Sequence, residues 1–159
     1  MDDLERRVRR LEDRQAIIDV VVRYCVTVDA RDWDGFATCF APTVRRDDGE
    51  LTRDEFVAVV AGALPGFRRT QHVSSNHVVT VDPEDPDRAT CDSDMYAQHE
   101  LAASSAGTWY LLRARYHNGM VRTPDGWRIA SILTTNRWEE GNLNAVAEAI
   151  EVVRQSAGG

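Results

Sequence analysis

Residues 16–29, AIIDVVVRYCVTVD, decide the fold of this 159-residue chain because they form an amphipathic helix that ends in an acid. Apolar residues recur there at i, i+4 and i+7, which predicts one packed stripe, and Asp29 continues that stripe at i+11. A carboxylate in packed surroundings costs free energy unless it is neutral, hydrogen-bonded or facing a cavity. The stripe consists of Ile18, Val22, Cys25 and Asp29.

The rest of the first forty per cent of the chain also favours helices. We expect one helix over residues 4–29 and a short second helix over residues 32–40, which stops at Pro42 because the residue before a proline disfavours the helical conformation. A third helix, over residues 52–64, begins with a Thr-x-x-Glu capping box and ends at a Pro-Gly pair.

After residue 66 the period of the apolar residues falls to near 2, which indicates strands. Proline, glycine and aspartate mark turns between them, so consecutive strands should form an antiparallel meander. A last helix is expected over residues 143–155, with residues 156–159 unstructured. The expected strands cover residues 69–82, 88–100, 108–122 and 127–138.

This order of elements predicts an α+β fold of one domain spanning residues 1–159. N-terminal helices would pack on a strongly curved, mostly antiparallel sheet and close one of its faces. The result is a cone-shaped α+β barrel that encloses a pocket lined by the sheet and by the first helix, where Asp29 lies.

Composition excludes several classes of function. The net charge is −7, and the 19 basic residues are all arginines scattered among acids, so nucleic acid is not an expected partner. The absence of lysine removes Schiff-base chemistry and Walker-type phosphate loops. Three widely spaced cysteines predict reduced core residues. No apolar run approaches the roughly 18 residues of a membrane span, so we expect a soluble, cytoplasmic protein without a membrane partner.

Asp29 and His72 are the candidate catalytic residues. If the helix packs on the sheet, Asp29 can hold His72 in one tautomer and stabilise its imidazolium, which leaves the other ring nitrogen free to take a proton from a ligand. Such a pair is a general base that needs no cofactor. His99, at the end of its strand, could act as acid toward a departing hydroxyl. Both histidines also fit a purely structural role.

Other side chains could bind a substrate or a metal. A general base contributes about 10² to 10⁴ in rate, so hydrogen-bond donors must stabilise the developing oxyanion. On a regular strand His72 and His77 lie on opposite faces, so no metal site is expected. Arg115 would suggest epoxide hydrolysis if it faced inward beside an acid, but a solvated outer face is the simpler interpretation. The candidate substrate-binding residues are Tyr24, Asn76, Tyr96, Tyr116 and Arg115.

Several short motifs together resemble the SnoaL-like family of the nuclear transport factor two superfamily, and within it the scytalone dehydratase branch. The resemblance covers residues 12–141 and implies a cone-shaped fold, a homo-oligomer that is most often a trimer, and chemistry without metal or cofactor. It places Asp29 and His72 at the positions of a catalytic pair and His99 at that of a second histidine. The motifs are Arg14–Ile17, Tyr24, Asp29, Asp32–Trp33, Phe40–Thr43, Arg69–His72, Asn76, His99, Gly126–Ile129 and Arg137–Trp138.

The chain also departs from that branch, because Val28 stands where the dehydratase has a tyrosine and no tyrosine follows the Ala-Pro-Thr segment. We therefore expect a cofactor-independent lyase or isomerase that acts on a hydrophobic, oxygenated cyclic metabolite, polyketide or steroid-like, rather than on scytalone itself. The alternatives are a non-catalytic ligand-binding or scaffold subunit, a polyketide cyclase and an epoxide hydrolase.

Overall fold

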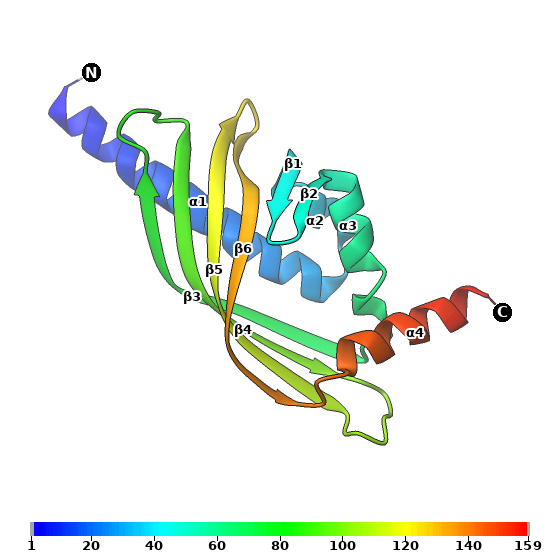
Figure 1. Cartoon of the computed structure of the whole chain (residues 1–159). Helices are drawn as coiled ribbons and strands as arrows, with labels where there is room; N and C mark the ends of the chain where they lie inside the picture. Colours follow the sequence, from blue (N-terminus) through cyan, green and yellow to red (C-terminus); the bar gives the residue numbers. More distant parts are fainter. Residues whose placement is uncertain (1, 159) are drawn as a thin grey trace.

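The computed structural model describes residues 2–158, which form a curved sheet with a long helix lying against it (Figure 1). The capping boxes at Asp2 and Thr52 begin the first and third helices. In chain order the elements are α1 (Asp3–Ala30), α2 (Trp33–Ala37), β1 (Phe40–Arg46), β2 (Gly49–Thr52), α3 (Arg53–Ala61), the 3-10 helix η1 (Leu64–Gly66), β3 (Arg69–Val81), β4 (Arg88–Glu100), β5 (Trp109–Thr123), β6 (Gly126–Gly141) and α4 (Ala145–Ala157).

The sheet has the strand order β2-β1-β6-β5-β4-β3, and β3 to β6 form the expected antiparallel meander. One pair, β1 with β6, is parallel. Side chains on the concave face of the sheet, on α1 and on α3 share the main hydrophobic core. The predicted α+β cone is confirmed, although the sheet stays open along β2 and β3.

Two strands were not expected from the sequence. The helix predicted over residues 32–40 ends at Ala37, and Phe40 begins β1 instead. Phe40 pairs with Ile129 of β6 and both are buried, so the tertiary partner outweighs the local preference. Pro42 is tolerated because the register shifts between residues 40 and 45. The last helix also differs from the prediction of a helix over residues 143–155 with an unstructured end. It covers Ala145–Ala157.

The buried face of α1 differs from the predicted stripe. Ile17, Val20 and Val21 are buried, whereas Val22 is 42% exposed. Cys25 is buried, and Asp29 lies at the edge of the buried face. Periodicity was misleading here because residues 20–22 are three consecutive valines, so two faces of the helix are apolar.

A buried acid, Asp13, joins α1 to the sheet. The Trp127 indole Nε1 donates to Asp13 Oδ1 at 3.1 Å, and Arg122 Nη2 lies 2.8 Å from the same oxygen. The Arg122 guanidinium also stacks over the Trp127 ring at 4.4 Å. These contacts connect α1 with β5 and β6 and fix the position of the helix on the sheet.

Two further expectations concern the cysteines and the membrane. Cys25, Cys39 and Cys91 are free and buried, as predicted. Within residues 2–158 no helix is long and apolar enough to cross a membrane.

Candidate active site

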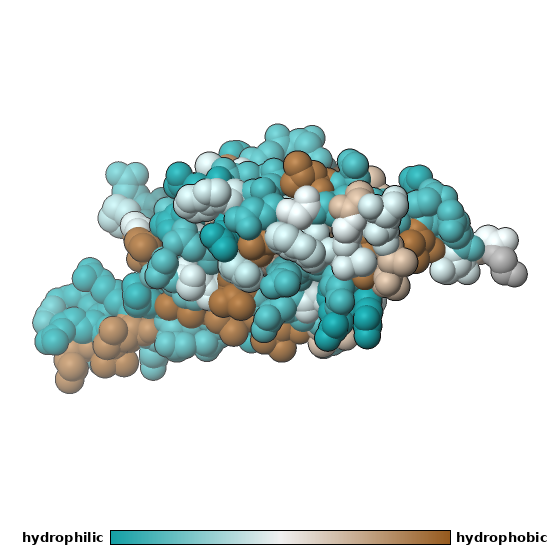
Figure 2. Space-filling view, turned by 90° about the horizontal axis from the view of Figure 1, so that it is seen from below, coloured by the Kyte–Doolittle hydropathy of each residue, from teal (hydrophilic) through white to brown (hydrophobic). Residues whose placement is uncertain are grey.

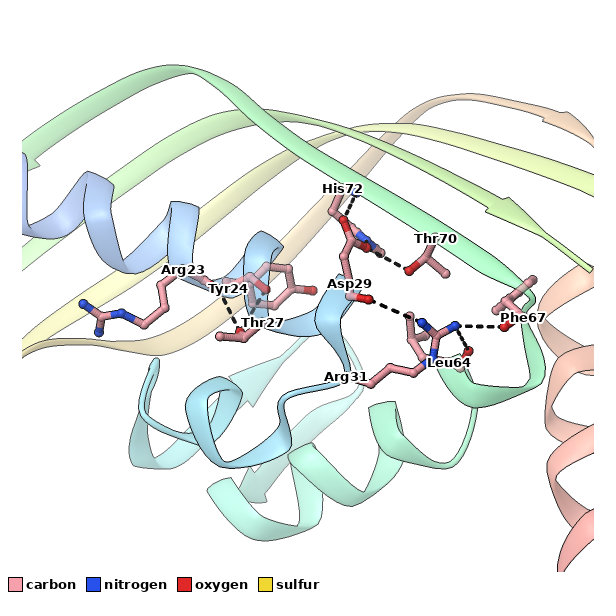
Figure 3. A network of polar contacts seen from close by, with 9 residues as sticks. All are labelled: Arg23, Tyr24, Thr27, Asp29, Arg31, Leu64, Phe67, Thr70 and His72. Atoms are coloured by element: carbon pink, nitrogen blue, oxygen red, sulfur yellow. Dashed lines mark hydrogen bonds and ion pairs between the residues drawn. The ribbon is translucent and has the colours of Figure 1, made fainter.

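The Asp29 carboxylate, at the end of α1, contacts His72 on β3 (Figure 3). Asp29 Oδ1 lies 2.7 Å from His72 Nδ1 and accepts a hydrogen bond from the Thr70 hydroxyl at 2.8 Å. Asp29 Oδ2 accepts a third bond, from the backbone N–H of His72, at 2.6 Å. The contact expected from the sequence is therefore present, and both carboxylate oxygens are fixed.

Arg31 holds the end of α1 in place. It adopts a left-handed conformation with φ 55° and caps the helix. Its guanidinium donates to the backbone carbonyls of Asp29, Leu64 and Phe67, at 3.3, 3.3 and 2.8 Å respectively. Figure 3 shows this side chain reaching from the end of α1 toward η1. These contacts fix the end of α1 against η1 and the residue after it, and so they also fix the position of the Asp29 carboxylate.

The surroundings keep Asp29 ionised at neutral pH. Burial alone raises the pKa of its carboxyl, but the hydrogen bonds from His72 and Thr70 outweigh burial and hold the pKa below its ordinary value. An ionised carboxylate can only accept hydrogen bonds, so the proton between the two groups belongs to His72 Nδ1. The other ring nitrogen, Nε2, is then the acceptor, and no hydrogen bond occupies it within residues 2–158.

His72 lines a cavity of about 470 Å³ between α1, α3 and the sheet. The His72 side chain is only 8% exposed, so the ring faces a largely dry environment. A larger groove, of about 790 Å³, lies at the other end of α1 and is lined by arginines of that helix and by valines and prolines of β3 and the turn after it. We assign the site to the smaller cavity because it contains the imidazole. Its apolar wall includes Val28, Phe56, Val60, Leu64 and Ile132.

Tyr24 and Tyr116 supply two hydroxyl groups to the same cavity. Their ring centroids lie 6.5 Å apart and their hydroxyls interact with each other. Burial raises the pKa of both phenols, most strongly that of Tyr24, so both stay protonated at neutral pH. Tyr24 also packs on Phe36 and Phe40, so it contributes to the core as well as to the cavity wall. Both residues lie where a ligand bound beside His72 would reach them.

His99 lies beside the pair but outside the cavity. Its ring is 5.2 Å from that of His72, in a perpendicular arrangement, and it packs against Phe67 and Tyr110. Burial, followed by repulsion from His72, lowers the pKa of His99 to about 4. A neutral imidazole has no acidic proton to give at neutral pH. The structure therefore does not support His99 as the acid.

A bulge in β3 corrects the predicted placement of the other histidine. Asn76 has φ 52°, and the register with β4 shifts between Ser75 and Val78. The extra residue turns His77 to the same face as His72, where its Nε2 lies 2.9 Å from the Ser74 hydroxyl. No group of three or more metal-ligating side chains occurs within residues 2–158.

Three predicted substrate-binding residues lie away from the cavity. The Asn76 amide donates to Asp94 Oδ2 at 2.8 Å, because the bulge turns this residue outward. Arg115 bonds Asp94 Oδ1 at 3.0 Å, and Tyr96 is 37% exposed beneath the Arg113 guanidinium. The expectation that Asn76 and Tyr96 line the pocket is wrong, whereas the outer-face interpretation of Arg115 is confirmed.

The mouth of the cavity includes two acids of the turn between β1 and β2. Asp47 and Asp48 form the turn between β1 and β2, and both line the cavity with Arg46. Asp47 Oδ2 accepts a hydrogen bond from the backbone N–H of Thr134 at 2.9 Å, which fixes the turn to β6. Arg46 forms an ion pair with Asp48 at 3.1 Å. No signal in the sequence predicted this placement, because it depends on the parallel β1–β6 pair.

Comparison with known proteins agrees with this architecture. A scytalone dehydratase-like protein of Claviceps purpurea is 26% identical over 150 residues, covering 85% of this chain and 94% of that protein. The Kfla4162 protein from Kribbella flavida is 27% identical, with a TM-score of 0.73 over 91% of this chain and 99% of that one. A hexachlorocyclohexane dehydrochlorinase of Novosphingobium barchaimii, 17% identical, shares the fold with a TM-score of 0.70 over 83% and 91% of the two chains. The model of the SnoaL-like domain matches residues 9–132, so the chain belongs to the SnoaL-like domain family.

Proposed function

We propose that the protein is a cofactor-independent lyase or isomerase in which His72 is the general base and Asp29 its orienting carboxylate. The observation that carries this proposal is the 2.7 Å contact between His72 Nδ1 and Asp29 Oδ1 beside a cavity that His72 lines. The ionised carboxylate stabilises the imidazolium that forms when Nε2 takes a proton. Neither residue needs a metal for this step.

The proton transfer fits an elimination next to a carbonyl group. His72 Nε2 takes a proton from the carbon beside the carbonyl, and the electron pair of the broken C–H bond forms an enolate. Expulsion of a hydroxide from the next carbon then forms the new C=C bond. The proton on His72 joins that hydroxide, so water leaves and the base is restored. For an isomerisation, His72 instead returns the proton to another carbon.

Tyr24 and Tyr116 are the proposed donors to the enolate oxygen. Both are protonated at neutral pH and both line the cavity beside His72. Donors aimed at a developing oxyanion in a dry site are commonly worth a factor of about 10² to 10³ each. They take the place of the two tyrosines that distinguish the dehydratase branch from this chain.

The cavity indicates the class of substrate. Its wall is mostly apolar, and its polar groups are the imidazole, the two phenols, Thr134 and the charged turn at the mouth. A pocket of about 470 Å³ accepts a small cyclic molecule and orients it through a few polar contacts. We therefore propose a hydrophobic, oxygenated cyclic ketone, of polyketide or steroid-like type, as substrate. The names of the Claviceps and Novosphingobium proteins, a dehydratase-like protein and a dehydrochlorinase, both denote eliminations.

The test combines ligand screening with isotope exchange. Cyclic ketones that raise the melting temperature are incubated with the protein in deuterium oxide, and deuterium entry at the carbon beside the carbonyl is followed by NMR. His72→Ala should abolish exchange and Asp29→Asn should slow it about 100-fold or more. The matched control is His77→Ala, a histidine on the same face of β3 without contact to Asp29. Exchange that survives His72→Ala contradicts the proposal.

The alternative functions differ in what this test would show. A non-catalytic binder would be stabilised by a ketone without exchanging its proton. A polyketide cyclase would exchange the proton but release a cyclised product, so it shares the base proposed above. Epoxide hydrolysis through Arg115 has no structural support, because that side chain lies on the outer face of the sheet with Asp92 and Asp94.

A further inference from the structure

One face of α1 is apolar and mostly exposed within residues 2–158. Leu4 is 64% exposed, Leu11 67% and Val22 42%, and all three lie opposite the buried face that contains Ile17 and Val20. Figure 2 shows hydrophobic surface along the projecting start of this helix. The residues of this face, called here the α1 seam, are Leu4, Val8, Leu11, Gln15, Ile18 and Val22.

The spacing of the α1 seam is that of a coiled coil. Successive residues are four, three, four, three and four positions apart, which is the alternation of heptad positions d and a. The a positions hold Val8 and Val22, and the d positions hold leucine at 4 and 11. β-Branched residues at a with leucine at d favour two strands, and a single polar residue at an a position, here Gln15, specifies register and strand number.

Charges on either side of the seam determine the orientation of a second helix. The e positions hold acids, at Glu5, Glu12 and Asp19, whereas the first two g positions hold Arg7 and Arg14 and the third holds the buried Val21. In a parallel pair each g residue meets the e residue five positions later in the other helix. Arg7 would then face Glu12 of the partner subunit, and Arg14 would face Asp19 of the partner subunit. An antiparallel pair would place arginine against arginine and acid against acid.

The two arginines are available for this contact. Within residues 2–158 the side chains of Arg7 and Arg14 form no ion pair or hydrogen bond, and both line the groove at the start of α1 beside the seam residue Leu11. The seam from Leu4 to Val22 covers about 27 Å of helix. None of the six seam residues lines the cavity that contains His72, so a second chain on the seam would leave that cavity accessible.

We propose that two copies of this chain pair in parallel through the α1 seam to form a dimer. The contact has apolar a and d positions, one polar residue that sets the register, and complementary charges on both flanks. It is independent of the proposed catalytic function, because no seam residue lines the cavity. It favours a dimer over the trimer expected from the family resemblance.

The first test is the mass of the full chain by sedimentation equilibrium. The wild type should sediment as a dimer of the 17.9 kDa chain. The double variant Leu11→Glu/Val22→Glu should raise the dissociation constant about 100-fold or more, because it places four carboxylates in the seam of each dimer. Both residues are exposed in the single chain, so circular dichroism should show an unchanged helical content. The matched control is Val152→Glu on α4, 47% exposed and outside the seam, which should remain dimeric.

The second test is the orientation of the pair. Leu4→Cys should form a disulfide-linked dimer on mild oxidation, because equivalent d positions are adjacent only in a parallel pair; the native cysteines are all buried. The charge variant Arg7→Glu/Arg14→Glu should weaken the dimer, and adding Glu12→Arg/Asp19→Arg in the same chain should restore it. A monomeric wild type, an oligomer that Leu11→Glu/Val22→Glu leaves intact, or a Leu4→Cys variant that forms no cross-link would each overturn the proposal.

Discussion

Replacing Asp13 by alanine should destabilise the protein more than any exposed substitution on α1. The change leaves the buried Trp127 Nε1, which donates to Asp13 Oδ1 at 3.1 Å, without an acceptor. An unsatisfied buried donor costs about 1 to 3 kcal/mol. Arg122 loses one partner but keeps Asp87, and its side chain is 25% exposed, so this loss adds only about 0 to 1 kcal/mol.

The expected total is therefore about 1 to 4 kcal/mol. For a chain of this size, each kcal/mol lowers the melting temperature by about 2 to 4 °C, so the expected decrease is roughly 2 to 16 °C. Thermal unfolding followed by circular dichroism measures it, with Arg9→Ala on the exposed face of the same helix as control. A double-mutant cycle with Trp127→Phe assigns the loss to the indole hydrogen bond, because Asp13→Ala should then cost about 1 kcal/mol less. A decrease below about 2 °C would refute this reasoning.

Three further predictions concern the site and the packing around it. Tyr116→Phe should lower kcat about 100- to 1000-fold for an active ketone while Tyr96→Phe, on the outer face, leaves it unchanged; equal effects would exclude the phenol as an oxyanion donor. Gly66→Ala should destabilise the protein by about 1 to 3 kcal/mol in urea unfolding, because a Cβ there would lie 2.0 Å from the Ala149 carbonyl oxygen, whereas Gly62→Ala should be nearly neutral. The pKa of Asp29 is held below its ordinary value, so its stabilising effect is complete above the unfolded pKa of about 3.9 and is lost as pH falls through the folded pKa. The stability difference between wild type and Asp29→Asn should accordingly shrink in acid, and a difference independent of pH would contradict it.

Local signals were sufficient for much of the fold. The Thr52–Glu55 capping box and the turns after residues 81 and 123 lie where the sequence predicted them. The contact between Asp29 and His72 was also predictable, because an acid at the end of an apolar helix requires a partner. The capping box and the turns depend on residues close together in the chain. The Asp29–His72 contact depends instead on the need of a partly buried carboxylate for a partner.

The remaining features depend on tertiary contacts that periodicity does not encode. β1 is a strand because β6 offers Phe40 a parallel partner, and that pair also brings Asp47 to the mouth of the cavity. The bulge at Asn76 reverses the faces predicted for His77 and for Asn76 itself. Asp13 was not singled out, since its partners Arg122 and Trp127 lie more than a hundred positions away.

The protonation of His72 tests the central proposal most directly. In the protein labelled with ¹⁵N-histidine, nitrogen chemical shifts identify which ring nitrogen carries the proton at neutral pH, and His72→Gln assigns the signal. The Asp29 contact predicts a protonated Nδ1 and a bare Nε2 that is free to accept a proton from a ligand. A neutral ring protonated at Nε2, unchanged by Asp29→Asn, would contradict the role of His72 as an oriented base.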